Sequence, residues 1–296
     1  MSLARRGTGG MRIAAIMRPC EIRAAIELVK LEQVDLKDIT LIGMDCPGAL
    51  PLQDFVKSPE DGEEKFKTAL RSFDDDGMRP VCQMCRSSAT LFGDLHFGFV
   101  GLEDRSCFLM SQTAKGNDAL DRMSLGAGVD ASAWARGIER LSARRDARRT
   151  EMLGKLTDRV VGTEKLLRAF GDCINCHNCM RVCPICYCRV CGFDSQRGGY
   201  PADDYFQRAQ SKGSLRLPSD TILFHLGRMA HMSLSCVSCG ACEDACPSSI
   251  PIAQIFSLVG DRAQRVFDYV PGSSVDDAIP VLVCRKEEFE GDDENG

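Results

Sequence analysis

The chain has no run of about 18 apolar residues, so it offers no segment long enough to cross a membrane as a helix. It also lacks surplus positive charge: 37 Lys and Arg against 42 Asp and Glu leave a formal charge of −5, which argues against a general nucleic-acid binder. A P-loop, a zincin motif and a nucleophile elbow are absent too. What remains is a chain of 296 residues, 44% of them hydrophobic, enough for two domains of ordinary size.

An export signal is also missing, because the pair Arg5-Arg6 is followed by Gly-Thr-Gly-Gly rather than by an apolar run. We therefore expect a reducing, cytoplasmic location. Cysteine is the abnormal component, with 17 residues, eleven of them between Cys173 and Cys246. In a reducing compartment such dense thiols are expected to be metal ligands rather than disulfides.

The pattern along the chain predicts an α/β protein in three parts. Residues 12–17 read as a buried strand, a helix follows from Pro19 to about Leu31, and residues 39–44 read as a second strand. Together they predict a βαβ unit with parallel strands. Further expectations are a helical pattern over 63–73 and two short strand-like runs within 94–111. We thus expect an α/β domain over 1–125, with a parallel sheet.

The second and third parts are a helical connector over 126–170 and a mostly helical domain over 171–296. Residues 134–170 carry ten basic and five acidic side chains, which indicates a solvated helical connector or, alternatively, a docking surface for an acidic partner. A further helix is predicted over 219–233, with an apolar face that includes Leu223, Leu226 and Met229. The six acidic residues within 287–294 predict a loose tail.

Two cysteine motifs carry the strongest chemical signal. Both follow the pattern C-x2-C-x2-C-x3-C-P of bacterial ferredoxins, with the cysteines at Cys173, Cys176, Cys179 and Cys183, and at Cys236, Cys239, Cys242 and Cys246. In two-cluster ferredoxins the fourth cysteine ligates the other cluster. The sequence therefore predicts two [4Fe–4S] clusters in a ferredoxin-like domain, one held by Cys173, Cys176, Cys179 and Cys246, the other by Cys236, Cys239, Cys242 and Cys183.

The alternative for these motifs is zinc in tetrahedral S4 sites, which rarely need the third cysteine that occurs in both motifs. Cys186, Cys188 and Cys191 exceed what two clusters require. They could be alternative cluster ligands, part of a further metal site, or buried thiols.

Four more cysteines surround the predicted βαβ unit. Cys20 and Cys46 each follow a parallel strand, and the carboxyl ends of such strands lie at the same edge of a sheet. Cys82 and Cys85 bring the count to four, enough for a third [4Fe–4S] cluster. The competing interpretation makes Cys20 and Cys46 small core residues while Cys82 and Cys85 bind something else.

A family resemblance rests on five segments: residues 18–23 (Arg-Pro-Cys-Glu-Ile-Arg), 43–48 (Gly-Met-Asp-Cys-Pro-Gly), 82–85, 95–98 (Leu-His-Phe-Gly) and 225–229 (His-Leu-Gly-Arg-Met). With them the chain resembles the beta-subunit family of coenzyme F420-reducing hydrogenase and F420-dependent formate dehydrogenase, and is most similar to the formate dehydrogenase branch. The resemblance covers most of residues 12–270.

The resemblance implies a cytoplasmic electron-transfer subunit that binds FAD, works with catalytic oxidoreductase subunits and exchanges hydride with F420 or another soluble carrier. It implies that Cys20, Cys46, Cys82 and Cys85 hold a [4Fe–4S] cluster beside the flavin. Only eleven residues precede the first predicted strand, where the family has a flavin-contacting portion. A separate polypeptide supplies that portion, or the FAD and F420 sites are incomplete. The rival function is a flavin-free electron wire and docking scaffold in a hydrogenase- or heterodisulfide reductase-type complex.

The remaining signals are weak. Arg18 flanks Cys20 at the sheet edge and is the one charged residue expected near a flavin. Residues 126–131 fit G-x-G-x-x-A without the preceding strand that a nucleotide fingerprint needs, so we interpret them as a turn. His177 is expected to tune a cluster by hydrogen bonding. His225 and His231 are expected to be surface or packing residues, and His96 has no visible partner.

Overall fold

The structure is a computed structural model that describes residues 7–89, 92–102, 106–123, 128, 130–188, 191–194, 202–213 and 221–283. Its N-terminal part is a four-stranded sheet in the order β1-β2-β3-β4, formed by β1 (Ile13–Met17), β2 (Ile39–Met44), β3 (Leu95–Gly98) and β4 (Phe108–Ser111). The pairs β1–β2 and β2–β3 are parallel, and β3–β4 is antiparallel. With α2 (Pro19–Lys30) between β1 and β2, the predicted βαβ unit is confirmed.

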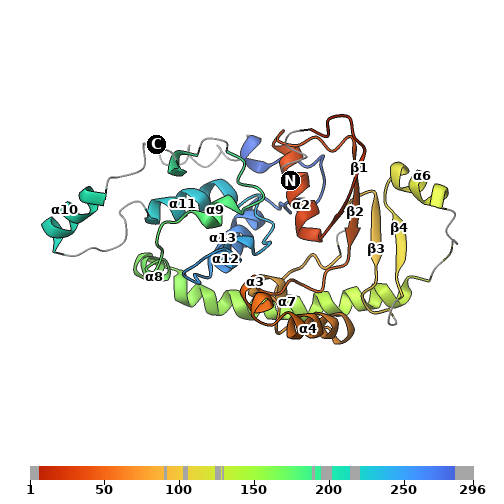
Figure 1. The fold of residues 1–296 in the computed structure, drawn as a ribbon, viewed down its shortest axis with the longest axis horizontal. Coiled ribbons are helices and arrows are strands. Elements are labelled where there is room, and N and C mark those ends of the chain that lie inside the picture. Colours follow the sequence, from red (N-terminus) through yellow and green to blue (C-terminus); the bar gives the residue numbers. More distant parts are fainter. Residues whose placement is uncertain are drawn as a thin grey trace, which may run out of the picture.

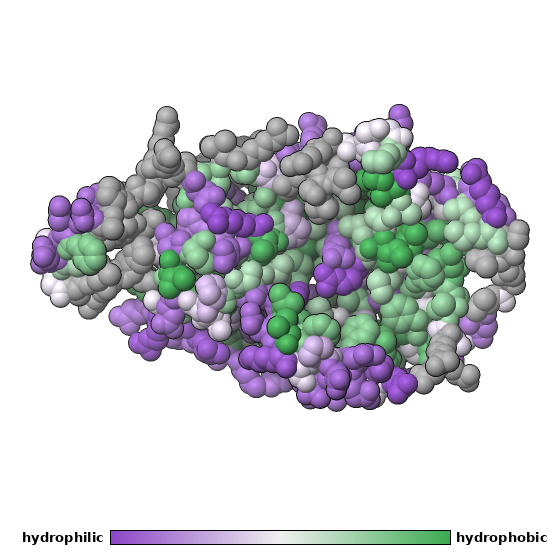
Figure 2. Space-filling model, viewed as in Figure 1, coloured by the Kyte–Doolittle hydropathy of each residue, from purple (hydrophilic) through white to green (hydrophobic). Residues whose placement is uncertain are grey.

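Strand β1 differs from its prediction as a buried strand. Its residues alternate between half-buried and exposed, and Ile16 is 64% exposed. β1 lies at the edge of the sheet, where only one of its faces is covered, so an apolar run there does not require burial on both sides. In Figure 2 hydrophobic residues gather over the sheet.

Three helices follow β2 and lead to the third strand: α3 (Leu52–Lys57), α4 (Pro59–Ser72) and the single turn α5 (Pro80–Gln83). The helical pattern predicted over 63–73 is the second half of α4. After β4 comes α6 (Ala114–Met123). Half of the predicted G-x-G-x-x-A turn and the whole acidic tail lie outside the described residues.

The long helix α7 (Ser132–Val160) and the short α8 (Thr163–Ala169) form the connector. Helix α7 runs beneath both the sheet and the C-terminal helices (Figure 1). Gly162, at φ +108°, separates the two helices, because few other residues adopt that backbone conformation. The predicted helical connector is therefore two helices rather than one.

The C-terminal part is helical. It comprises α9 (Asn178–Arg181), α10 (Ala202–Lys212), α11 (Thr221–Met232), α12 (Ala241–Asp244) and α13 (Ile252–Val266), with 3-10 turns η1 (Gly192–Asp194) and η2 (Pro280–Leu282). Its core is built around Phe170, Phe224 and Phe256 and takes in Val81 and Met84 from the loop around α5. The N-terminal part thus reaches into the C-terminal core. The chain is α/β overall, as predicted, and the two boundaries between the three predicted parts stay a prediction.

No helix within the described ranges is long and apolar enough to span a membrane.

Candidate metal centre

The two cysteine motifs fold into the same backbone shape. In the first, Asn175 and His177 have left-handed φ angles of 56° and 59°; in the second, Ser238 and Gly240 have 56° and 80°. His177 and Gly240 each cap a one-turn helix, α9 and α12. Alternation of right- and left-handed residues turns successive backbone N–H groups into one concavity, the arrangement that proteins use around anions and iron–sulfur sites.

Gly240 also meets a steric requirement that His177 does not. A Cβ added at Gly240 would lie 2.7 Å from Cγ2 of Val81, too close for any side chain in place. Val81 belongs to α5, between Cys82 and the sheet. The close approach of these two loops therefore brings the N-terminal cysteines beside the second motif.

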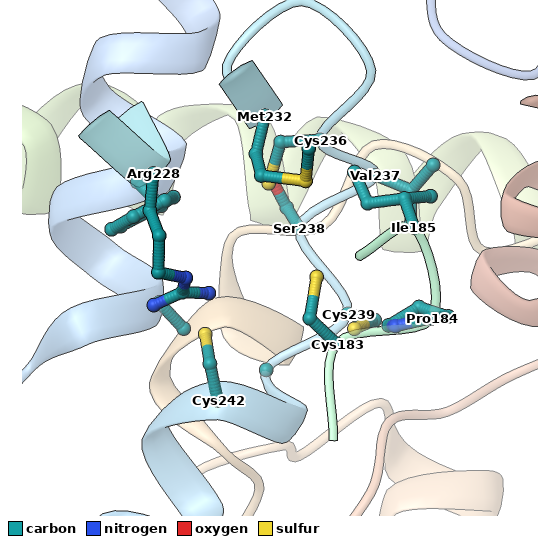
Figure 3. A pocket seen from close by; sticks show the side chains of 13 residues that line it. Cys183, Pro184, Ile185, Arg228, Met232, Cys236, Val237, Ser238, Cys239 and Cys242 are labelled. Atoms are coloured by element: carbon teal, nitrogen blue, oxygen red, sulfur yellow. The ribbon is translucent and has the colours of Figure 1, made fainter. Parts of the chain in front are cut away.

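The first motif contributes its last cysteine to the second. Cys183 lines one cavity together with Cys236, Cys239 and Cys242. Figure 3 shows these four thiols around the cavity, with the guanidinium of Arg228 pointing toward Cys242. This is the grouping that the sequence predicted for one cluster.

The other predicted group also lies together. Burial raises the pKa of Cys179 to about 11. The charge of Arg228 lowers this pKa, and the charges of Cys173, Cys246 and Cys176 raise it. Those three thiols are the remaining members of the predicted set. The structure thus brings the fourth cysteine of each motif to the opposite motif.

The four N-terminal cysteines form a third group at the sheet edge. Cys20 is the second residue of α2, Cys46 follows β2, and Cys82 and Cys85 lie in and just after α5. Burial is the main cause that raises the pKa of Cys20, Cys46 and Cys82. The charge of Cys85 raises all three pKa values further, and the charge of Cys46 raises those of Cys20 and Cys82. Among the thiols that raise the pKa of Cys20, Cys239 acts most strongly. The third group therefore adjoins the second ferredoxin-type motif.

Helix α11 supplies polar contacts to sulfur that the sequence analysis missed. His225 is fully buried, stacks on Phe170 with ring centroids 3.9 Å apart, and places Nε2 3.3 Å from Sγ of Cys173. Burial lowers the pKa of His225 to about 4. Arg228 donates hydrogen bonds of 3.1 Å to Sγ and to the carbonyl oxygen of Cys179.

The predicted apolar face of this helix is wrong in part: Leu223 is 61% exposed and Leu226 is 43% exposed. The buried face pairs Phe224 and Met229 with His225 and Arg228, because this face packs on cysteine loops whose sulfur and carbonyl atoms need donors. Of the two interpretations of His225, the surface one is therefore wrong and the packing one is confirmed, with a contact to sulfur in addition. His177 hydrogen-bonds Asn175 and stacks on Phe224, so its predicted bond to a cluster stays a prediction.

Arginines of α7 hold the N-terminal cysteine loops, which corrects the interpretation of this basic stretch as a purely solvated face. Arg145 is 1% exposed, pairs with Asp75 at 3.2 Å and donates to the carbonyl oxygens of Cys46 and Pro47. Arg149 pairs with Asp261 at 2.8 Å and donates to the carbonyl oxygen of Met84. A helical basic pattern cannot show which arginines point inward, because the spacing fits both faces.

Asp45 fixes the sheet edge beside Cys46. This fully buried carboxylate lies 2.9 Å from Nε2 of His96 and accepts bonds from Trp134 Nε1 and from the N–H groups of Phe99 and Val100. His96 therefore has the partner that the sequence did not reveal. The only signal was the position of Asp45 directly before Cys46.

Two further arginines lie beside the N-terminal cysteines. Arg23 of α2 donates hydrogen bonds to the carbonyl oxygen of Pro271 at 2.8 Å and to the hydroxyl of Ser87 at 3.0 Å. Burial lowers the pKa of Arg23, and the charges of Cys85, Cys20 and Cys236 act in the opposite direction. It thus stands between the third group and the second motif. Arg18 pairs with Glu21 at 2.7 Å, remains 38% exposed and is within electrostatic reach of Cys20 and Cys46.

No three His, Cys, Asp or Glu side chains converge tightly enough for a single metal ion in the part of the chain that the structure describes. The donor sets that it does contain are three groups of four thiols. Most thiols of the two ferredoxin-type motifs, together with Cys20, pack against one hydrophobic core, and Arg228 and Arg23 lie beside them. Thiolate-only sets with such surroundings fit iron–sulfur clusters.

Residues 169–250 match the family of 4Fe-4S dicluster domains. The fold and the site therefore define an iron–sulfur protein of the electron-transfer class. The chain is 30% identical, over 91% of its length and 74% of the relative, to F420-dependent formate dehydrogenase 1 subunit beta of Methanococcus maripaludis. It is 25% identical, over 92% of its length and 76% of the relative, to F420-dependent formate dehydrogenase subunit beta of Methanocaldococcus jannaschii. The chain belongs to this family of formate dehydrogenase beta subunits.

Proposed function

We propose that this chain is the flavin-linked electron-transfer subunit of a cytoplasmic, multisubunit formate dehydrogenase. It would relay electrons between a soluble hydride carrier and a catalytic partner subunit. Its curated relatives are named as F420-dependent enzymes, so F420 is the carrier we propose. When bound, an iron–sulfur cluster exchanges single electrons and a flavin exchanges two.

The observation that carries this proposal is the contiguity of the three thiol groups. Cys20 of the N-terminal group lies within electrostatic reach of Cys239. Cys239 shares a cavity with Cys183, which comes from the first motif. Arg228 lines that cavity and donates to Cys179 of the remaining group. These contacts support an order in which each group lies next to the following one.

In this proposal the chain's own residues hold, orient and shield the redox groups. We propose as ligands the three sets predicted from the sequence: Cys20, Cys46, Cys82 and Cys85; Cys183, Cys236, Cys239 and Cys242; and Cys173, Cys176, Cys179 and Cys246. The buried side chains of Val81, Phe224 and Phe256 exclude water from these sets. Arg23 and Arg228 supply positive charge that favours the more negative, reduced state.

The flavin belongs, in this proposal, on the outer side of the N-terminal group. Arg18 is the residue we assign to it, because its half-exposed guanidinium lies beside Cys20 and Cys46 and faces solvent where a cofactor can enter. A guanidinium suits the phosphate groups of FAD.

The test is a cofactor count on protein purified without oxygen, both alone and with its partner subunits. We expect acid-labile sulfide and at least about twelve irons per chain, four for each of the three thiol groups, and FAD in the complex. FAD missing from both preparations would remove the hydride-carrier part and leave a flavin-free electron wire. Zinc in place of iron, with no sulfide, would overturn the proposal as a whole.

A further inference from the structure

Between Cys173 and Cys246, three cysteines lie outside the repeat that the two motifs form. Counted from Pro184 and Pro247, the positions of Cys186, Cys188 and Cys191 correspond to Ser249, Pro251 and Gln254 in the second motif, as the sequence shows. The backbone turns match as well: the N–H of Cys186 bonds the carbonyl of Cys183, and the N–H of Ser249 bonds that of Cys246. A dicluster fold therefore needs no thiol at any of the three positions.

The structure nevertheless gathers these three cysteines around one cavity. The cavity measures about 370 Å³ and is lined by Cys186, Cys188 and Cys191, by His231 of α11 and by Arg228. Cys188 and His231 are exposed, while Cys186 and Cys191 are half-buried, so one side opens to solvent. This is far more room than the roughly 15 Å³ that one water-sized occupant needs.

The donors on this cavity have a chemistry of their own. Three thiols and an imidazole are soft ligands, which select iron–sulfur clusters, zinc and copper over hard cations. The described side chains do not converge on a single ion, and the room exceeds one ion. Imidazole replaces thiolate as a cluster ligand in Rieske centres, so His231 can complete a set of four.

We propose that Cys186, Cys188, Cys191 and His231 hold an additional [4Fe–4S] cluster, separate from the three thiol groups of the proposed function. His231 and Arg228 lie three residues apart on one face of α11, and Arg228 lines both this cavity and the one formed by Cys183, Cys236, Cys239 and Cys242. The N–H of Cys186 also bonds the carbonyl oxygen of Cys183, so the two cysteines lie in one turn. The additional site is a branch beside the dicluster motif, at the surface.

The test compares iron and acid-labile sulfide per chain in anaerobically purified wild type, the double variant Cys188→Ser/Cys191→Ser and the control Cys107→Ser. Cys107 is exposed and lies outside all four sites. We expect the double variant to lose about four irons and about four sulfides, with one electron paramagnetic resonance signal missing after dithionite reduction. The control should match wild type. Retention of the full count, or loss of zinc instead of iron, would overturn the proposal.

Two further variants keep the inference testable. The alternative is that Cys186 serves the neighbouring group of Cys183, Cys236, Cys239 and Cys242. In that case Cys186→Ser would lower the iron count and the double variant would not, and this result would overturn the proposal. If the double variant does not accumulate, His231→Ala decides, because this side chain is exposed and helix-compatible. We expect an altered signal that His231→Cys restores; an unchanged signal would overturn the proposal. All these readouts are independent of electron transfer, so they can succeed where the proposed function fails.

Discussion

Replacing Arg228 with methionine is expected to lower the reduction potential of the cluster held near Cys179. Arg228 is 3% exposed and donates a 3.1 Å hydrogen bond to Sγ of Cys179. Its guanidinium also lies within electrostatic reach of Cys183 and Cys242. Reduction adds negative charge, so a buried cation stabilises the reduced state and its removal makes reduction harder.

The size of the shift follows from that hydrogen bond. A bond to a charged group contributes about 1.5–3 kcal/mol, and a tenfold change in equilibrium equals about 1.4 kcal/mol, or about 59 mV for one electron. The full bond would therefore be worth roughly 60–130 mV. Since the oxidised state also carries a thiolate, we take about half of this, roughly 30–60 mV.

The assay is a redox titration of anaerobic protein, followed by electron paramagnetic resonance. Arg228→Lys is the matched control, because it keeps the charge, and it should shift the potential by much less than Arg228→Met. Equal iron content in both variants shows that the clusters are retained. A potential that stays the same or rises in Arg228→Met would refute the assignment of Arg228 as an electrostatic partner of the cluster.

Three further predictions follow from the buried contacts. Arg145→Met removes the buried partner of Asp75 and should lower the free energy of unfolding in urea by about 3 kcal/mol. Arg148→Met, at a 29% exposed site, should lower it by less than about 1 kcal/mol, and equal losses would contradict this. Asp45→Asn should lower the free energy of unfolding by about 2 kcal/mol. It should also shift the fluorescence emission of Trp134, the single tryptophan, because it weakens the 2.8 Å hydrogen bond from the indole; an unshifted spectrum would count against that bond. Cys239→Ala should stay soluble but lose about four irons and stop electron transfer across the chain; undiminished transfer would rule out the proposed route.

The sequence predicted the cysteine chemistry well because ligand spacing is local. Three thiols within one tight turn, followed by a cysteine and a proline, constrain the backbone so strongly that both loops were predictable as cluster loops. The βαβ unit was also predictable, since strand and helix periods appear in single short segments. The predicted burial of the strand over 12–17 was wrong. Ile16 is exposed because this strand lies at the edge of the sheet, and its edge position depends on the order of the strands.

The side chains that face the cysteines could not be predicted in the same way. The basic pattern of α7 gave no sign that Arg145 and Arg149 point inward, and the apolar pattern of α11 placed Leu223 on the wrong face. The inward face of each helix is otherwise largely apolar, and carbonyl and sulfur acceptors on distant loops select the few positions where an arginine or histidine stands on it. Such acceptors outweigh hydrophobicity, because a buried polar atom without a partner is costly.

The sequence by itself determined which residues can bind iron and sulfide, since that depends on thiols at short, fixed intervals. Only the tertiary structure decided that Cys20 lies beside Cys239 and that Cys186, Cys188 and Cys191 share a cavity with His231. These are contacts between segments far apart in the chain, and they form where helices pack and loops cross rather than where residues follow one another.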